Sequence, residues 1–262
     1  MIWLICYLIT FFACVLGTLC GMGGGIIIKP VLDAAGVMSV ATITFLSGCT
    51  VITMSCWSVG KSFLKKDAEL ELHSTSILAV SAAIGGLLGK QLYTMTAALF
   101  ANQNTAGGVQ AALLLVATFA TLIYTIRKDK IPSRQISSTP LTLVIGLALG
   151  MLGAFLGIGG GPFNVAILCY FFSMPTKKAT QNSLFIVLFS QLASVMKTIL
   201  SDGIPVFDST VLLGMMLLGI AGSEVGRRIN KKIDNHQATL CLEGIMVFVI
   251  MINIFNMVKF FK

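Results

Sequence analysis

The sequence predicts an all-α polytopic membrane protein made of two tandem, inverted repeats. Each repeat is expected to contain a glycine-broken helical hairpin followed by three membrane-spanning helices. Of the 262 residues, 56% are hydrophobic and only 11% are charged, and a water-soluble domain of this length cannot bury so much apolar surface. A glycine cluster also occurs twice, each time between two apolar segments. We therefore expect a single membrane domain over residues 1–262.

Apolar segments give the expected positions of the helices. A helix needs about 20 apolar residues to cross a bilayer. Spans of that kind are expected at residues 40–62, 74–92, 106–126, 180–201, 209–225 and 238–258. Before each set of three spans we expect two arms that form a hairpin, namely 3–20 with 26–36, and 140–156 with 162–174.

The two glycine clusters, Gly21–Gly25 and Gly157–Gly161, separate these arms. Each cluster reads Gly-x-Gly-Gly-Gly, and a glycine inside a helix costs about 1 kcal/mol relative to alanine. We therefore expect the helix to break at both clusters. A bilayer tolerates a broken backbone only where protein surrounds it or where it lines a cavity, so the breaks are the main indication of function.

One register relates the two halves of the chain. It maps the first glycine cluster onto the second and Thr44 onto Thr180 without a gap. We therefore predict an internal duplication with repeats at 1–134 and 135–262. The basic connector that ends the first repeat marks the boundary.

The distribution of charge indicates how the repeats face. If each hairpin enters and leaves on one side, each repeat crosses three times and the two repeats are inverted. The basic loops at 61–73, 127–134, 177–178 and 227–232 then share one face, opposite Lys90, Lys259 and Lys262. Arms that together make one kinked crossing would instead divide the positive charge almost evenly. Because positively charged loops favour the cytoplasm, we predict the first arrangement, with both termini outside.

Helix breaks of this kind can bind an anion. A helix N-terminus presents backbone N–H groups without intrahelical partners and the positive end of the helix dipole, and both favour a negative ligand. Lys29 would add one full positive charge. The candidate binding residues are Gly23, Gly24, Gly25, Lys29, Thr44, Ser47, Gly159, Gly160, Gly161, Asn164, Thr180, Gln181, Asn182 and Ser183.

Structural roles compete with this interpretation. Glycine clusters also let membrane helices pack closely, and Lys29 can pair with Asp33, four residues later on the same helix face. Serine and threonine in membrane helices often bond their own backbone. A binding role therefore requires the two breaks to meet inside the protein.

Other function classes lack their motifs in this sequence. The glycine clusters do not continue into the Gly-Lys-Ser/Thr of an ATPase phosphate loop, and no cysteine pair has metal-ligand spacing. No set of nucleophile, base and acid is visible either. We therefore expect no enzyme, no cofactor and no metal. We also expect no nucleic-acid partner, because the orientation of the basic loops in the membrane explains the net charge of +8.

Three motifs resemble those of the TauE/SafE family of membrane permeases, often described as sulfite exporters. They are GMGGGIIIKPVL at 21–32, GIGGGPFNVAIL at 157–168 and KATQNSL at 178–184. The resemblance covers nearly the whole chain and implies a multi-pass inner-membrane transporter of small sulfur anions, such as sulfite or organosulfonates. With the duplicated break, we predict alternating access around the two clusters. An anion channel and a non-transporting subunit of a complex are the alternatives, and a homo-oligomer stays open.

Overall fold

The computed structural model describes residues 2–64, 71–100, 103–136 and 138–260. Its helices are α1 (Ile2–Leu19), α2 (Gly25–Ala35), α3 (Val40–Leu64), α4 (Leu72–Ala98), α5 (Gln103–Arg127), α6 (Thr139–Phe155), α7 (Gly161–Phe172), α8 (Thr176–Lys197), α9 (Ser209–Lys232) and α10 (Asn235–Phe260). A 3₁₀ turn, Lys128–Lys130, follows α5, and a π-helical turn, Thr198–Asp202, extends α8. The described part of the chain contains no strand.

Six of the described helices are long and apolar enough to cross a bilayer, namely α3, α4, α5, α8, α9 and α10. They correspond to the six predicted spans, so the polytopic helical fold is confirmed. In contrast, α2 and α7 have 11 and 12 residues, which at 1.5 Å per residue makes each about 17 Å long. That length is roughly half of a hydrocarbon core.

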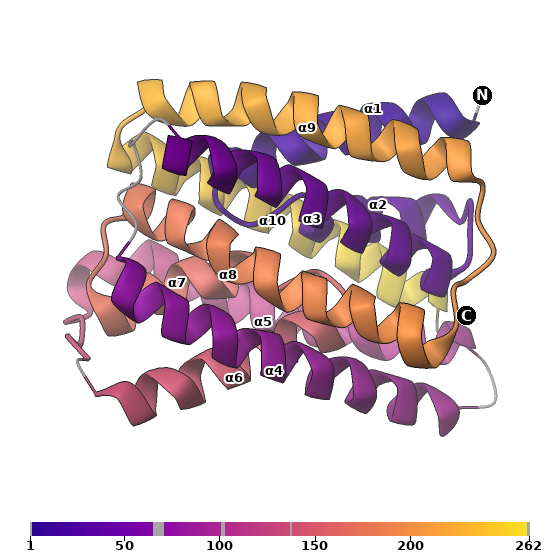
Figure 1. Cartoon of the computed structure of the whole chain (residues 1–262), viewed down its shortest axis with the longest axis horizontal. Coiled ribbons are helices and arrows are strands. Elements are labelled where there is room, and N and C mark those ends of the chain that lie inside the picture. The colour runs from indigo at the N-terminus through magenta and orange to yellow at the C-terminus, as the bar shows by residue number, and fades with distance from the viewer. Residues whose placement is uncertain (1, 65–70, 101–102, 137, 261–262) are drawn as a thin grey trace.

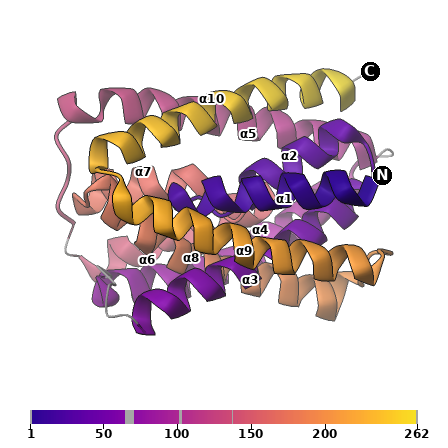
Figure 2. The same ribbon diagram turned by 90° about the horizontal axis from the view of Figure 1, so that it is seen from above.

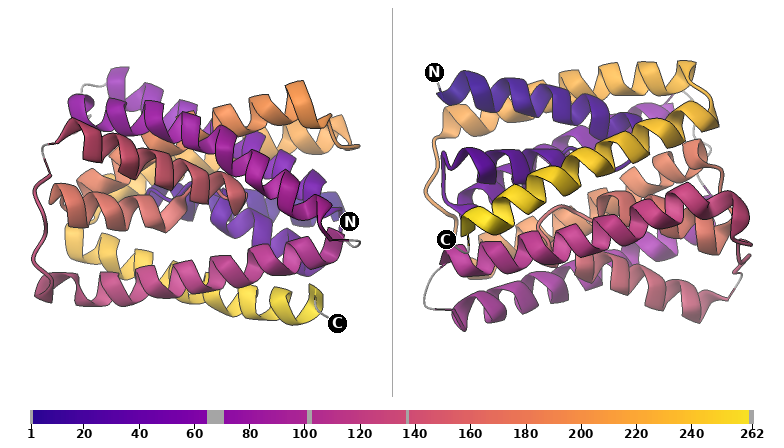
Figure 3. Two further views of the ribbon diagram at one scale, coloured as in Figure 1. Left: turned by 90° about the horizontal axis from the view of Figure 1, so that it is seen from below. Right: turned by 180° about the vertical axis from the view of Figure 1, so that it is seen from behind.

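The short helices return to the side from which their partners enter. Figure 1 shows α1 and α2 as a hairpin that opens at the end of the bundle where the N and C labels lie. The α6–α7 hairpin opens at the opposite end. The start of α1 and the end of α10 lie at the same end of the bundle in every view (Figures 1, 2 and 3). The two hairpins therefore face in opposite directions.

Helix pairs in the two halves pack in equivalent ways. The helix α4 lies along α6 and α8, α9 lies along α1 and α3, and α10 lies beside α5 (Figure 2). A Cβ on Gly85 of α4 would lie 2.1 Å from the carbonyl oxygen of Leu147 in α6. A Cβ on Gly222 of α9 would lie 2.5 Å from the carbonyl oxygen of Phe11 in α1. Phe11 maps onto Leu147 in the register that relates the glycine clusters, so the two contacts correspond.

Several helices extend beyond the predicted spans. The span expected at 209–225 continues to Lys232, so its basic residues occupy the last turns of α9 instead of a loop. Likewise α8 begins at Thr176 and includes Lys177 and Lys178, and α4 continues to Ala98. Hydropathy measures the part of a helix that lies in hydrocarbon, whereas lysine and arginine are good helix formers and continue the helix beyond it. Of the basic residues used to orient the chain, Lys65, Lys66 and Lys262 lie outside the described residues.

Candidate functional site

The two glycine breaks meet inside the bundle. A Cβ on Gly25, the first residue of α2, would lie 3.3 Å from the carbonyl oxygen of Ile158 in the second break. In the other direction, a Cβ on Gly161, the first residue of α7, would lie 3.5 Å from the carbonyl oxygen of Met22 in the first break. The N-termini of α2 and α7 therefore lie side by side, each against the backbone of the other break.

Each break also packs on the following span of the opposite half. A Cβ on Gly21 would lie 2.4 Å from the Cα of Thr180 in α8. A Cβ on Gly157 would lie 3.1 Å from the Cγ2 of Thr44 in α3. Because backbone approaches this closely, only glycine fits at Gly21 without a shift of the main chain.

The backbone of the breaks is left-handed at several glycines. The φ angles are 70° at Gly21, 69° at Gly23, 71° at Gly157, 77° at Gly159 and 97° at Gly160. Residues with a side chain rarely adopt these angles, whereas glycine does so readily. The glycines therefore form the turn that ends one arm and starts the next.

This turn leaves backbone N–H groups without acceptors. The amide of Gly24 donates to the sulfur of Met54 at 3.2 Å. Among the described residues, the N–H groups of Gly23, Gly25 and Ile26 in the first break, and of Gly160 and Gly161 in the second, have no acceptor. All of these residues are buried, and buried N–H groups are normally paired. The unpaired amides lie where the positive ends of two helix dipoles converge.

Two polar side chains beside the breaks are likewise unpaired. The hydroxyl of Ser47 lies 3.2 Å from the Cβ position of Gly25, and the carboxamide oxygen of Asn164 lies 2.7 Å from that of Gly160. Ser47 is 0% exposed and Asn164 is 1% exposed. Neither the hydroxyl nor either end of the carboxamide has a hydrogen-bond partner. A polar ligand in contact with these groups would satisfy them.

Lys29 brings a positive charge to the second break. Its Cε lies 3.0 Å from the Cβ position of Gly157, and its ammonium group donates to Asp33 Oδ2 at 2.9 Å. Both side chains are buried, and Asp33 Oδ1 has no hydrogen-bond partner. Lys29 thus forms the pair with Asp33 and also reaches the break of the opposite half.

Comparison with known proteins identifies the family. A family model described as "Sulfite exporter TauE/SafE" matches residues 6–254. The chain belongs to the TauE/SafE family. It is 22% identical over 259 residues to the probable membrane transporter protein YunE of Bacillus subtilis (strain 168), a match that covers 89% of this chain and 90% of YunE. No solved structure matches significantly.

Membership of the TauE/SafE family establishes the general class of function. The protein is a multi-pass membrane transporter and not an enzyme. Both predictions made from the sequence are confirmed at this level. In the described part of this TauE/SafE chain, no group of three or more His, Cys, Asp or Glu side chains is placed to hold a metal ion.

Three predicted hydroxyl groups of this TauE/SafE protein bond to backbone. Thr44 donates to the carbonyl oxygen of Val40 at 2.7 Å, and Thr180 donates to that of Thr176 at 2.8 Å. Ser183 donates to the carbonyl oxygen of Gly21 at 2.6 Å. The threonine bonds stay within their own helices, whereas the bond of Ser183 fixes the first break against α8.

Asn182 bonds to residues at the start of α4, and Gln181 lines a cavity. The side-chain oxygen of Asn182 accepts bonds from the hydroxyl of Thr75 at 2.5 Å and from the amide of Glu71 at 3.2 Å. Asn182 therefore joins α8 to the start of α4. Gln181 lines a small polar cavity between α8 and α9.

Two buried amide side chains support the hairpins and were not singled out from the sequence. Asn256 of α10 donates to the carbonyl oxygen of Pro30 in α2 at 2.8 Å. Gln110 of α5 donates to the carbonyl oxygen of Phe155 at the end of α6 at 2.6 Å. Both residues interrupt apolar spans, and polar residues in such spans usually have a partner inside the bundle. That interruption was the available signal.

Proposed function

We propose that this transporter carries a small oxyanion past the two glycine breaks. The observation that carries the proposal is the convergence of two helix N-termini with unpaired, buried amides. A negative ligand would accept hydrogen bonds from the amides of Gly25 and Gly161 and gain from both helix dipoles. Ser47 and Asn164 would complete its shell, with Lys29 as the nearby positive charge.

We further propose that the anion contains sulfur, such as sulfite, thiosulfate or an organosulfonate. The family's description as sulfite exporters supports this choice. The geometry supports it too, because tetrahedral and pyramidal oxyanions present several acceptor oxygens to amides that converge from two directions.

The proposed mechanism is alternating access by two inverted repeats, 1–134 and 135–262. Supporting contacts are those of Gly85 with Leu147 and of Gly222 with Phe11, which correspond in the two halves. Tilting one repeat against the other would expose the central site to one side at a time.

We propose a plasma-membrane location with both termini outside. The described basic residues at the end opposite the termini include Arg127, Lys128, Lys130, Arg134, Lys177, Lys178, Arg228, Lys231 and Lys232. The positive-inside rule places that end in the cytoplasm.

Flux measurements on the purified chain in proteoliposomes test the proposal. The wild type is expected to carry at least one of sulfite, sulfate, thiosulfate and a short organosulfonate, with saturation. Gly160→Leu is expected to fold but to lose flux. Unitary currents would indicate a channel instead, and a purified chain that carries none of these anions would remove the proposal. Full flux in a folded Gly160→Leu variant would exclude this site.

A further inference from the structure

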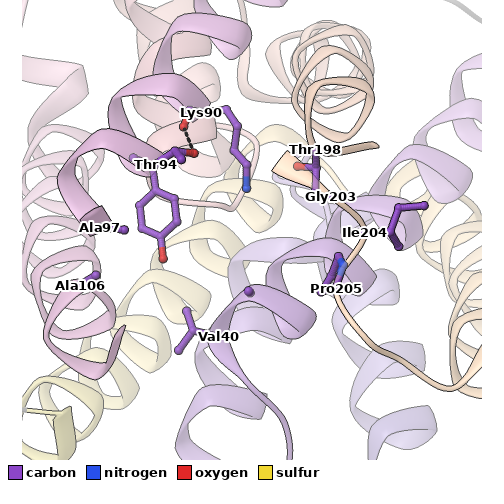
Figure 4. Close-up of a pocket in the computed structure, with 11 residues that line it drawn as sticks. Val40, Lys90, Thr94, Ala97, Ala106, Thr198, Gly203, Ile204 and Pro205 are labelled. Atoms are coloured by element: carbon purple, nitrogen blue, oxygen red, sulfur yellow. Dashed lines mark hydrogen bonds between the residues drawn. The ribbon is translucent and has the colours of Figure 1, made fainter. Parts of the chain in front are cut away.

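A cavity of about 430 Å³ opens at the end of the bundle that holds the termini. It lies between the start of α3, the end of α4 and the segment that follows α8, and its lining includes Val40, Lys90, Tyr93, Thr94 and Thr198. Figure 4 shows the side chain of Lys90 directed into this space. The Lys90 nitrogen lies 5.6 Å from the ring centroid of Tyr93.

A second, much smaller cavity of about 30 Å³ lies at the basic end. Its lining includes Thr18, Ser58, Ser62, Thr180, Arg227 and Asn230. Arg227 is 8% exposed, and its Nε has no hydrogen-bond acceptor. The hydroxyl of Thr18, just before the first break, is also buried and unpaired. This cavity therefore presents unpaired donors.

Lys90 and Arg227 occupy corresponding places in the two halves. Each directly follows the second glycine of a Gly-x-x-x-Gly motif, Gly85–Gly89 in α4 and Gly222–Gly226 in α9. A Cβ on Gly89 would lie 2.1 Å from the carbonyl oxygen of Met151, and one on Gly226 would lie 2.3 Å from that of Val15. Val15 maps onto Met151 in the register of the glycine breaks. Each cation thus follows an equivalent packing contact.

The next residues on the same helix faces also correspond. Asn230, three residues after Arg227, donates to the carbonyl oxygen of Leu19 at the end of α1, at 2.6 Å. Tyr93, three residues after Lys90, packs its ring on Phe155 at the end of α6, with 6.1 Å between centroids. Leu19 maps onto Phe155 in the same register. The two cavities therefore occupy corresponding places in the two halves.

Side-chain bonds cross the narrow cavity at the basic end. Glu224 accepts bonds from Trp57 at 3.1 Å and from Lys61 at 3.2 Å, which tie α9 to α3. The same carboxylate accepts two bonds from Arg227, at 3.2 and 3.3 Å. In the first half, the position that corresponds to Glu224 is Leu87, an exposed apolar residue.

We propose that Lys90 and Arg227 are paired entrance residues that attract and hold the anion at opposite mouths of the transporter. In the conformation described, the cavity at Lys90 is wide and the cavity at Arg227 is narrow, and Glu224 bonds Arg227 and ties α9 to α3. This proposal rests on anion transport as the function. It assigns binding roles to two residues outside the central site.

Thiol labelling of detergent-purified protein tests the proposal without requiring transport. Thr94→Cys would place a thiol in the wide cavity and Ser62→Cys would place one in the narrow cavity, in a parent whose reactive native cysteines are serine. Thr94→Cys is expected to react faster than Ser62→Cys, and to prefer an anionic methanethiosulfonate reagent over a cationic one. Adding Lys90→Met should reduce that preference about sevenfold, because one charge about 7 Å away in water changes the rate of each reagent about threefold, in opposite directions. Adding Lys259→Met, at the same end but outside the cavity lining, should not change it.

Flux in oriented proteoliposomes gives the second measurement. Lys90→Met should raise the half-saturating anion concentration when anion is added at the terminal side, and Lys90→Arg should restore it. Arg227→Met should act from the other side, with Arg227→Lys restoring it. A labelling preference that Lys90→Met does not change would overturn the entrance assignment. A faster reaction at Ser62→Cys than at Thr94→Cys would also overturn it. Absence of flux in the wild type would overturn the transport proposal alone, because the labelling result does not depend on it.

Discussion

The ammonium group of Lys29 lies 2.9 Å from Asp33 Oδ2, and this ion pair is buried in a half-length membrane helix. Such pairs contribute little net stability, because desolvation offsets most of the attraction. The side chain of Lys29 also contacts Gly157 of the opposite half. The pair therefore places a lysine beside the second break, at a place where an isolated charge would be costly.

Asp33→Asn is expected to destabilise the folded protein. It would leave Lys29 buried without a counter-charge, and removal of one partner of a buried pair costs about 3–5 kcal/mol. The double variant Lys29→Met/Asp33→Leu should recover most of the stability, because it removes both charges. Thermal unfolding of the three proteins in detergent measures this. An Asp33→Asn variant as stable as the wild type would contradict the expectation.

Transport measurements distinguish the two roles of Lys29, namely pairing with Asp33 and binding of the transported anion. The double variant is expected to fold but to carry anions at least tenfold more slowly, since Lys29 is the only charged residue among the nearest neighbours of Gly157 in the described part of the chain. Flux in proteoliposomes is the measurement. Normal flux in the double variant would show that Lys29 serves only to pair with Asp33.

Gly160→Ala is expected to reduce transport strongly. The φ angle of 97° disfavours any side chain, at a cost of about 1–2 kcal/mol, and the added Cβ would meet the carboxamide of Asn164 at 2.7 Å. Gly244→Ala is the matched control, because its Cβ would meet nothing within 4 Å. The control should be neutral or more stable by about 0.4–1 kcal/mol. Equal flux in both variants would argue against a specific role of the second break.

The global fold could be predicted from the sequence because bilayers impose strong rules. The hydrocarbon thickness predicted the six spans, and the glycine clusters predicted the breaks between the arms. The uneven charge of the loops predicted that the two hairpins face in opposite directions. The ends of α4 and α9 were placed several residues too early and the start of α8 several residues too late, because polar helix turns outside the hydrocarbon leave no hydropathy signal.

The candidate binding site was harder to predict from the sequence than the fold, because a difference of one residue decides which way a helical side chain points. Ser47 and Ser183 correspond in the two halves, yet Ser183 bonds Gly21 while Ser47 is unpaired. Asn182, next to Ser183, faces α4. Sequence order alone does not separate such cases, and the cations at Lys90 and Arg227 were visible only as orientation signals.

Gly89→Ala should destabilise the bundle more than an ordinary glycine substitution in a helix. The new methyl group would lie 2.1 Å from the carbonyl oxygen of Met151, a backbone atom that can move only if α4 and α6 separate. Gly60→Ala is the control, because a Cβ there meets nothing within 4 Å. We expect a loss of about 1–3 kcal/mol for Gly89→Ala, as for other overpacked interiors, and little change for the control. Unfolding midpoints in detergent compare them, and a Gly89→Ala midpoint equal to the control would show that the contact is looser than described.

Cysteine labelling of intact cells should show Val206 outside and Gln135 inside. Val206 is 95% exposed in the segment before α9, at the end that holds the termini, and Gln135 is exposed directly after the basic connector 127–134, at the other end. Because the positive-inside rule places the connector in the cytoplasm, an impermeant maleimide should label Val206→Cys directly. Gln135→Cys should be labelled only after permeabilisation, and the parent protein corrects for native cysteines. The reverse pattern would invert the proposed orientation, and labelling of both residues in intact cells would indicate mixed insertion of the two halves.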